Sequence, residues 1–424
     1  MTSALIADLE WRGLIAQTTD RAALLEQLNS GSTAFYIGFD PTAPSLHLGN
    51  LVVLLVMRRF QLAGHKPLPL VGGATGLVGD PSGRNEERSL NEVEIVEQWV
   101  ERIRHQLSKF LDFDNGANTA VMTNNLDWTK PVSALDFLRD IGKHFSVNQM
   151  LAKDSVSSRL ESGGISYTEF SYQVLQAFDF LELYRRFDCK IQLGGSDQWG
   201  NIVAGLDLIR KVEGGSAHCL TIPLLMKSDG SKFGKTAGGS VWLDPEMTSP
   251  YAFYQFWLNS DDADIPKYLK VFSFKSHEEI EELISLHKVN PGLREAHRAL
   301  ARELTTLVHG TSECEGAERA AKALFGQGDL AELDERTLES ALSQLPRTTV
   351  VTGEPIPTWV DLLAATGLVD SKSAARRIVK EGGAYLNNEK VGETEFAPTH
   401  ENLLFGRFLL LRKGKRDLAA VEII

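Results

Sequence analysis

The chain has 424 residues, of which 43% are apolar and 24% are charged, and these values are typical of an ordinary globular protein with two or three domains. Its longest apolar run, Leu51 to Met57, is too short to span a membrane, and its N-terminus has no secretion signal, so we expect a cytoplasmic protein without a membrane partner. The formal charge of −12 argues against sequence-independent nucleic-acid binding, so no DNA partner is expected, and three scattered cysteines argue against a disulfide framework or a cysteine-only zinc site.

Short β-rich runs alternate with longer helical patterns between Thr33 and about Leu225. The strand candidates are TAFYIGF (33–39), KPLPLVGGAT (66–75), NTAVMTNN (118–125), CKIQLGG (189–195) and HCLTIPLLM (218–226). Amphipathic segments such as 90–110 and 168–187 lie between them. This alternation predicts an α/β fold, a doubly wound, Rossmann-like parallel sheet that binds ligands at the carboxyl ends of its strands.

Changes in composition divide the chain into five parts. We expect the α/β domain to cover residues 1–227, a flexible loop rich in Gly, Ser and Lys to cover 228–248, and an all-helical domain to cover 249–325. A weakly patterned acidic linker covers 326–355, and a small α+β domain covers 356–424. That last domain has ten basic and nine acidic residues, so it is the least acidic part of the chain.

The segment YIGFDPTAPSLHLGN runs from a strand across two prolines into a helix. Ser45 is a good N-cap, and apolar residues follow at helical spacing, so the helix is predicted to begin at about Leu46. His47 and Asn50 then share its first turn, where unpaired N–H groups attract anions, and Gly49 lets a ligand lie close to the backbone. We interpret this turn as the seat of a nucleotide phosphate. The alternative is a solvated histidine beside a glycine of no consequence.

The segment VGGATGLVGDPSGRNEER (71–88) contains five glycines near a strand end, which indicates a tight loop that approaches a ligand. Its spacing fits neither the dinucleotide fingerprint nor a Walker-type loop. Asp80 could hold an ammonium group, and Arg84 and Arg88 follow. Ordinary surface charge is the alternative for the two arginines.

The helix predicted at YTEFSYQVLQAFDFLEL carries a polar line on an otherwise apolar surface. Tyr172, Gln176 and Asp179 stand at i, i+4 and i+7, so they share one face. A buried polar group without a partner costs about 1 to 3 kcal/mol, so this line needs partners. A small polar ligand such as an amino acid could supply them, and a structural network in the core is the alternative.

Two further glycine-containing segments offer polar groups. LGGSDQWGN (193–201) ends a predicted strand with Asp197 and Gln198, although an ordinary turn would use the same residue types. GSKFGKT (230–236) carries Lys232 and Lys235, whose ammonium groups could close over a phosphate. Solvated surface lysines are the common alternative.

Together these segments resemble the bacterial tyrosyl group of the class I aminoacyl-tRNA synthetases. HLGN at 47–50 resembles the family's HIGH signature, and KFGKT at 232–236 resembles its KMSKS signature. The segments GGATGLVGDPSG, DIGKHFSVNQM, EFSYQVLQAFDF and GGSDQWGN follow in family order across nearly the whole chain. Two departures, Asn50 in the first signature and Phe233-Gly234 with Thr236 in the second, leave the division of ribose and phosphate binding open.

The resemblance implies an enzyme that activates L-tyrosine with ATP and then transfers the tyrosyl group to the 3′ end of tRNA(Tyr) for protein synthesis. It also implies Mg²⁺ as the companion of ATP, no dedicated protein metal site, and a homodimer. The tyrosine site that it implies comprises Tyr36, Asp80, Asn125, Tyr172, Gln176, Asp179 and Gln198.

The resemblance also implies which residues handle ATP. The nucleotide-binding residues would be Gly38, Asp40, His47, Gly49, Asn50, Gly195, Asp197 and Lys235. The catalytic set that stabilises the phosphates would be Thr42, His47, Asn50, Arg84, Arg88, Lys232 and Lys235.

The C-terminal segment SKSAARRIVKEGGAYLNNEKV resembles a small RNA-binding module of some ribosomal proteins, pseudouridine synthases and bacterial tyrosyl synthetases. Basic residues recur at helical spacing and give one phosphate-facing side. They are Lys372, Arg376, Arg377 and Lys380. We expect this module to hold the tRNA, and a solvated basic helix is the alternative.

Two other functions compete with the synthetase hypothesis. One is a synthetase-like RNA-binding protein without activity, and the other is a different nucleotidyl-transferring ligase that shares the HIGH signature. Tyrosine-dependent exchange of pyrophosphate into ATP distinguishes all three.

Overall fold

The computed structural model describes residues 2–81, 91–153, 156–157, 160, 164–236, 239–353 and 355–424. By their contacts they form two compact units. Unit 1 is Met1–Met247 with Asp261–Lys288, and unit 2 is Thr248–Ser260 with Val289–Ile424. Each helix in these described ranges is too short or too polar to cross a membrane.

Unit 1 is built on a six-stranded sheet with the order β1-β6-β5-β2-β3-β4. The strands are β1 (Gln17–Thr18), β2 (Ala34–Phe39), β3 (Lys66–Val71), β4 (Thr123–Asn124), β5 (Cys189–Gly195) and β6 (His218–Ile222). All neighbours from β6 to β4 pair in parallel, and β1 adds an antiparallel edge to β6. The doubly wound parallel sheet predicted from the sequence is therefore confirmed, although β4 is far shorter than the predicted run of 118–125.

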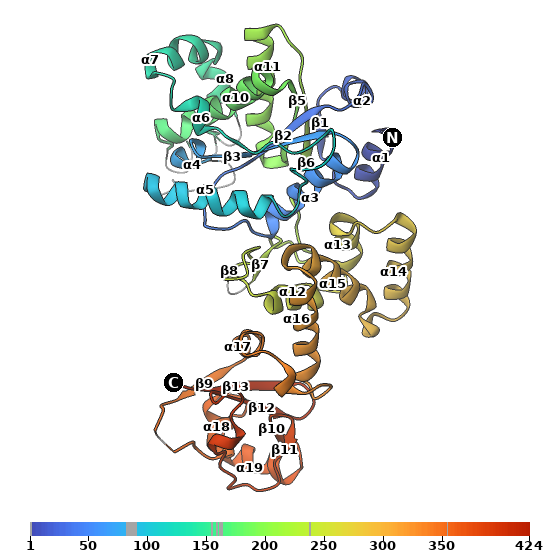
Figure 1. Cartoon of the computed structure of the whole chain (residues 1–424), viewed down its shortest axis with the longest axis vertical. Helices are drawn as coiled ribbons and strands as arrows, with labels where there is room; N and C mark the ends of the chain where they lie inside the picture. Colours follow the sequence, from blue (N-terminus) through green and yellow to red (C-terminus); the bar gives the residue numbers. More distant parts are fainter. Residues whose placement is uncertain are drawn as a thin grey trace. The chain divides into compact units, whose positions relative to one another are not determined.

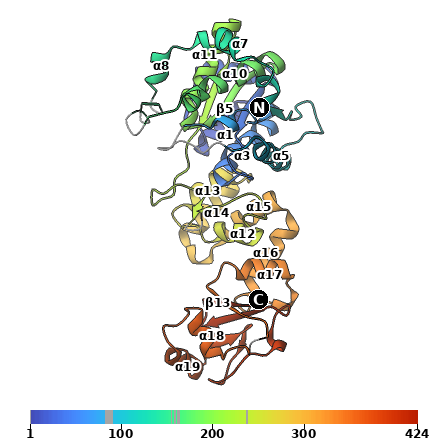
Figure 2. The same cartoon turned by 90° about the vertical axis from the view of Figure 1, so that its left-hand side faces the viewer.

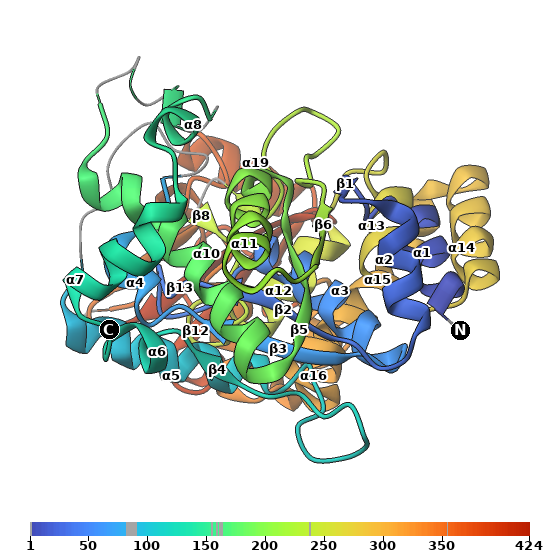
Figure 3. The same cartoon turned by 90° about the horizontal axis from the view of Figure 1, so that it is seen from above.

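Helices cover both faces of this sheet. Those of unit 1 are α1 (Thr2–Trp11), α2 (Arg21–Asn29), α3 (Leu48–Leu62), α4 (Thr75–Val78), α5 (Val93–Leu107), α6 (Leu126–Thr129), α7 (Ala134–Asp136), α8 (Val147–Leu151), α10 (Tyr167–Phe187), α11 (Trp199–Glu213), α13 (Ile265–Phe272) and α14 (His277–Val289). Figure 1 shows α10 and α11 on one face and α3 and α5 on the other, and Figure 3 shows α10 and α11 from above. Buried side chains such as Leu68, Phe180, Leu181 and Ile202 fill the layer between α10, α11 and the sheet.

The direction in which successive strands are added to the sheet reverses between β2 and β5. The chain adds β3 and then β4 on one side of β2, and returns through α10 to add β5 and β6 on the other side. The carboxyl ends of β2 and β5 therefore border a crevice at the switch point, the usual ligand position in an open α/β sheet.

The helices α13 and α14 belong to unit 1 by their contacts, whereas the sequence placed them in the helical part at 249–325. The guanidinium of Arg12, the residue after α1, donates to the carbonyl oxygens of Lys270 and Ser273 at 2.9 and 2.8 Å. Arg59 in α3 also donates to the Ser273 carbonyl, at 2.6 Å. Both arginines are buried, so these bonds tie the end of α13 to α3 and to the turn that follows α1.

Unit 2 combines helices with a five-stranded sheet of order β11-β10-β12-β13-β9. Its helices are α12 (Pro250–Leu258), α15 (Glu295–His309), α16 (Thr311–Ala323), α17 (Glu335–Leu342), α18 (Trp359–Ala365) and α19 (Lys372–Lys380). Its strands are β9 (Arg347–Val350), β10 (Ala384–Leu386), β11 (Glu389–Lys390), β12 (Phe408–Lys413) and β13 (Asp417–Ile423). Figure 2 shows α18 and α19 beside this sheet, and Trp359 and Val379 pack with Leu409 and Val421 in its core.

The segment 326–355 is not the weakly patterned linker that the sequence suggested. It contains α17 and β9, and β9 pairs in parallel with β13. RTTV is too short and polar to be recognised as a strand from its own sequence. It forms a strand because it pairs with β13, which lies far along the chain.

Candidate functional site

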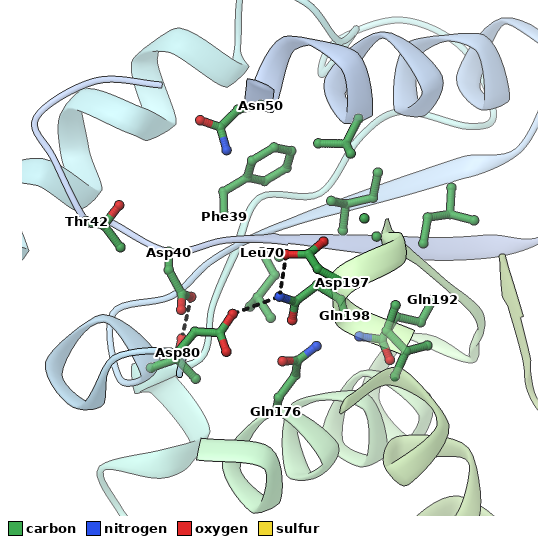
Figure 4. A pocket seen from close by; sticks show the side chains of 18 of the residues that line it. Phe39, Asp40, Thr42, Asn50, Leu70, Asp80, Gln176, Gln192, Asp197 and Gln198 are labelled. Atoms are coloured by element: carbon green, nitrogen blue, oxygen red, sulfur yellow. Dashed lines mark hydrogen bonds between the residues drawn. The ribbon is translucent and has the colours of Figure 1, made fainter. Parts of the chain in front are cut away.

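A cavity of about 370 Å³ opens at the carboxyl ends of β2 and β5 (Figure 4). Most of its lining comes from the end of β2 with the loop that follows, the first turn of α3, the polar face of α10, and β5 with its following turn, and the segment after β3 adds Thr75 and Asp80. The expected residues among the lining are Gly38, Asp40, Thr42, His47, Gly49, Asn50, Asp80, Tyr172, Gln176, Asp179, Gly195, Asp197 and Gln198. Arg84 and Arg88 lie outside the described residues.

The first turn of α3 is capped by His47 and not by Ser45. Nδ1 of His47 accepts from the backbone N–H groups of Gly49 and Asn50 at 3.0 and 3.4 Å. In return, Oδ1 of Asn50 accepts from the His47 N–H at 3.0 Å, which closes a capping box, and the helix begins at Leu48. The prediction of Ser45 as cap with a start at Leu46 was therefore wrong, because an imidazole nitrogen takes the usual part of a serine oxygen.

The amides of this turn are consequently occupied within the chain. Besides the two that His47 accepts, the N–H of Leu48 donates to the Val241 carbonyl at 3.0 Å. The interpretation of these amides as a free phosphate seat is not supported. What the turn offers to a ligand is the Nε2–H of His47, since Nδ1 already accepts and the proton must lie on the other nitrogen.

The imidazole of His47 lies against Gly49 and explains why this position has no side chain. A Cβ atom at this position would lie 2.8 Å from Cε1 of His47, so a larger residue would displace the ring. Burial lowers the pKa of His47, and the charge of Lys235 lowers it further, which keeps the ring neutral near pH 7. At Gly38, by contrast, a Cβ would meet nothing within 4 Å, so a ligand has room to approach the backbone there.

Asp179 sits at the inner end of the cavity with both oxygens hydrogen-bonded. The indole N–H of Trp128 donates to Oδ1 at 2.8 Å, and Nδ2 of Asn125 donates to Oδ2 at 3.0 Å. Burial raises the pKa of Asp179 to about 8, although both donors favour its carboxylate form. Asn125 is fully buried and does not line the cavity, and its Oδ1 accepts from the Ala74 N–H at 2.7 Å. Asn125 therefore orients Asp179 in this structure and does not face the ligand space, in contrast to its expected direct role.

Three buried polar atoms near the cavity lack a hydrogen-bond partner among the described residues. They are Oη of Tyr36, Oε1 of Gln176 and Oε1 of Gln192. Tyr36 in β2 and Gln192 in β5 are paired neighbours in the sheet. Burial raises the pKa of Tyr36, and the nearby charge of Asp179 raises it further. A ligand with a hydroxyl and an ammonium group would satisfy such atoms, each of which otherwise costs about 1 to 3 kcal/mol.

The sequence analysis missed Trp128 and Gln192. Gln192 is a polar residue between the apolar Ile191 and Leu193 in the middle of β5, and that position was the available signal. Trp128 lies in the short helix α6, and nothing local to it in the sequence indicates that its indole N–H reaches Asp179.

Acidic side chains surround the middle of the cavity. Oδ2 of Asp40 accepts from the Tyr172 hydroxyl at 2.6 Å, and Gln198 links Asp80 and Asp197 through Nε2 at 2.8 and 3.3 Å (Figure 4). Burial raises the pKa of Asp197, and the nearby charge of Asp80 acts in the same direction. This group of carboxylates suits a cationic ligand such as an α-ammonium group.

The lysine segment lies next to the cavity, although neither lysine lines it in this structure. Both side chains are exposed. Lys235 is near enough to His47 to lower its pKa, and Lys232 is near enough to Asp197 to lower its pKa. Both His47 and Asp197 line the cavity. One region of unit 1 thus contains His47, Lys232, Lys235 and Asp179.

The expected RNA-binding residues form the outer side of α19. Lys372, Arg376, Arg377 and Lys380 are all exposed, while Ala375 and Val379 face the core. Lys372 pairs with Asp361 at 2.7 Å, and Arg376 and Arg377 make looser ion pairs with Glu395 and Glu381. Exposed pairs of this kind contribute at most about 1 kcal/mol, so they do not prevent contact with phosphates.

The chain is similar to known proteins along nearly its whole length. Residues 28–326 match the family described as tRNA synthetases class I (W and Y), and residues 337–421 match the tyrosine–tRNA ligase SYY-like C-terminal domain. The chain is 60% identical to the tyrosine–tRNA ligase of Streptomyces avermitilis and 55% identical to that of Corynebacterium glutamicum, with 99% of each chain covered in both comparisons.

Among solved structures, the chain is similar to the C-terminally truncated mitochondrial tyrosyl-tRNA synthetase of Aspergillus nidulans. The TM-score is 0.69 at 31% identity, and the match covers 76% of this chain and 94% of that one. The resemblance read from the motifs is confirmed, and the chain belongs to the tyrosine–tRNA ligase family of class I tRNA synthetases.

Proposed function

We propose that this chain is a tyrosine–tRNA ligase that forms tyrosyl-AMP and pyrophosphate from L-tyrosine and ATP, and then transfers the tyrosyl group to the 3′ end of tRNA(Tyr). Beyond family membership, the observation that carries the proposal is the buried hydroxyl of Tyr36, which has no hydrogen-bond partner among the described residues and lies near Asp179. Asp179 lines the cavity, and a hydroxyl and a carboxyl close together are the donor and acceptor that a phenol requires.

Tyrosine would bind with its phenol hydroxyl between Tyr36 and Asp179. A site built in this way rejects phenylalanine, because the analogue would leave the Tyr36 hydroxyl without a partner and would make no hydrogen bond with Asp179. Asp80, Tyr172 and Gln176 would hold the ammonium group. Gln198, fixed by its bond to Asp80, would lie near the reacting carboxylate.

The first reaction is the attack of the tyrosine carboxylate on the α-phosphorus of ATP, with pyrophosphate as the leaving group. A carboxylate is already ionised at pH 7, so no general base is needed. The protein must instead align the reactants and stabilise the charge that spreads onto pyrophosphate. Thr42, the Nε2–H of His47, and the ammonium groups of Lys232 and Lys235 are the donors proposed for that task.

The adenosine would lie against the backbone at Gly38, where there is room, with Gly195 and its neighbours on the other side. Asp40, Asn50 and Asp197 would contact this part of the substrate. Mg²⁺ would arrive with ATP as its counter-ion. The exposed basic side of α19 would contact the tRNA. We further propose a homodimer, as the sequence resemblance implies, and a cytoplasmic location, as expected from the sequence composition.

Exchange of labelled pyrophosphate into ATP, with tyrosine, phenylalanine or no amino acid, tests the function. We expect exchange only with tyrosine, and we expect Tyr36→Phe and Asp179→Ala to reduce the preference for tyrosine. Tyr385→Phe in unit 2 is the matched control and should behave as the wild type. An RNA-binding protein without activity would show no exchange, and full retention of the preference in both variants would refute the phenol site.

A further inference from the structure

The two residues between the lysines of KFGKT are buried, while the lysines on either side are exposed. Phe233 has only 8% of its surface exposed. Two consecutive residues fixed in the protein determine the backbone from which both ammonium groups extend. Lys232 and Lys235 are therefore positioned by what holds Phe233 and Gly234.

Phe233 is held by two aromatic rings of α13, which we call the aromatic platform (Tyr268 and Phe272). Its ring centroid lies 5.1 Å from that of Tyr268 and 5.2 Å from that of Phe272. Both platform residues are almost completely buried. Aromatic pairs at such distances contribute about 0.5 to 1.5 kcal/mol beyond the burial of their surface.

The same helix also holds the backbone that leads into the loop. Oδ1 of Asp264, just before α13, accepts from the Ser228 N–H at 2.8 Å. Nζ of Lys267 donates to the Met226 carbonyl at 2.8 Å. The platform is thus part of a broader attachment of the loop to α13.

Gly234 attaches the loop to α3 as well. Its φ of +77° is a conformation that favours glycine, and a Cβ there would lie 3.1 Å from Cβ of Leu48. Its carbonyl accepts from the Val241 N–H at 3.0 Å, and the Val241 carbonyl accepts from the Leu48 N–H at 3.0 Å. The loop therefore lies directly against the turn that carries His47.

The platform is also attached to parts of unit 1 other than the loop. The end of α13 is fixed to α3 and to the turn after α1 by the bonds from Arg59 and Arg12 to the Ser273 carbonyl. This is a rigid support of the kind that holds reacting groups within the tolerance that catalysis needs.

We propose that Phe233, seated on Tyr268 and Phe272, is a positioning residue that sets where Lys232 and Lys235 meet the leaving pyrophosphate. The inference rests on the proposed function and extends it. It gives the segment Asp261–Lys288 a part in the activation of tyrosine, although the sequence grouped this segment with the helical domain. Phe233 would act only through the lysines and would not touch the substrate.

Kinetics of pyrophosphate exchange, together with equilibrium binding of tyrosine without ATP, test the inference in the full-length chain. We expect Phe233→Ala to lower kcat of exchange by about tenfold to a hundredfold, since small misplacements of catalytic groups have effects of this size. The Kd for tyrosine should stay within a factor of about two of the wild type, because the tyrosine site is formed elsewhere. Phe233→Leu, which keeps an apolar anchor, should recover much of kcat, and Phe405→Ala, at an exposed phenylalanine of unit 2, should have no effect.

A double-mutant cycle separates positioning from general damage. In a Lys232→Ala/Lys235→Ala background, Phe233→Ala should cause little further loss, because the groups that it positions are gone. An equal loss in both backgrounds, or an unchanged kcat in Phe233→Ala, would overturn the inference. Absence of tyrosine-dependent exchange in the wild type would instead refute the proposed function.

Discussion

The indole N–H of Trp128 points at Oδ1 of Asp179 across 2.8 Å in the interior of unit 1. Together with the bond from Asn125, it fixes the carboxyl group of Asp179 before any ligand is bound. Asp179 is close enough to Tyr36 to raise the pKa of the Tyr36 hydroxyl, after the larger effect of burial. A group held in this way needs no reorganisation when a phenol arrives, which is the general advantage of a preorganised polar site.

Replacing Trp128 by phenylalanine removes this donor and keeps most of the ring. We expect Trp128→Phe to raise KM for tyrosine and to weaken the preference over phenylalanine, by an amount that corresponds to about 0.5 to 1.5 kcal/mol, the usual contribution of a hydrogen bond between neutral groups. Steady-state exchange with both amino acids measures the effect. Trp359→Phe is the matched control, because its indole N–H is buried without a partner among the described residues. An unchanged preference in Trp128→Phe would contradict the orienting role.

The raised pKa of Asp179 predicts a pH-dependent stability. Its pKa is about 8 in the folded protein, against an ordinary value of 3.8, so between these values the folded protein keeps a proton that the unfolded chain releases. The free energy of unfolding should therefore fall as pH rises through this window, by up to about 1.4 kcal/mol per pH unit from this group. Above about pH 8 the contribution becomes constant.

Asp179→Asn cannot titrate, so its stability relative to the wild type should improve as pH rises toward 8. Urea denaturation of both proteins at several pH values measures the difference, in which the other titrating groups cancel. A constant difference from about pH 5 to about pH 8 would show that Asp179 is ionised in the fold throughout this range.

His47 caps α3 through Nδ1, and we propose that its Nε2–H has a separate role as a donor to ATP. We expect His47→Ala to lose both, with a free energy of unfolding lower by about 1 kcal/mol, the usual cost of an N-cap. His47→Asn restores a capping oxygen without the Nε2–H, so its stability should be near that of the wild type while exchange remains impaired. If His47→Asn exchanged pyrophosphate as fast as the wild type, the imidazole would act as a cap alone.

Much of the fold followed from the sequence because its signals are local. The run CKIQLGG became β5 without change of bounds, and the polar line at Tyr172, Gln176 and Asp179 faces the cavity as predicted. Both patterns are complete within one element, where alternation and helical spacing are sufficient.

The errors arose where a distant residue decides the outcome. β1 and β9 are short, and each depends on a partner strand from another part of the chain, so neither has a pattern of its own. The cap of α3 was misread because histidine is an uncommon N-cap, and only the space over Gly49 makes it possible. The attachment of Phe233 to α13 likewise depends on a helix that begins some thirty residues later.

The basic side of α19 predicts a separation between the two reactions. Replacing Lys372, Arg376, Arg377 and Lys380 together by glutamine removes exposed charge and keeps side-chain length, so the fold should persist. We expect the rate of tRNA charging to fall and its salt dependence to weaken, since fewer counter-ions would be released, while tyrosine-dependent exchange stays unchanged. Substitutions in the full-length chain are a better test than removal of the C-terminal domain by truncation near residue 354. Such a truncation would leave β9 without its partner strand β13.

The quadruple substitution Arg104→Gln/Lys109→Gln/Lys130→Gln/Arg210→Gln, at exposed basic residues of unit 1, controls for the change in net charge. It should leave both reactions as they are in the wild type. Equal losses of exchange and charging in the α19 variant would mean that the damage reaches unit 1 and that α19 has no selective part in holding the tRNA. A loss of charging alone, with a smaller dependence on salt, is the result that phosphate contacts on this helix require.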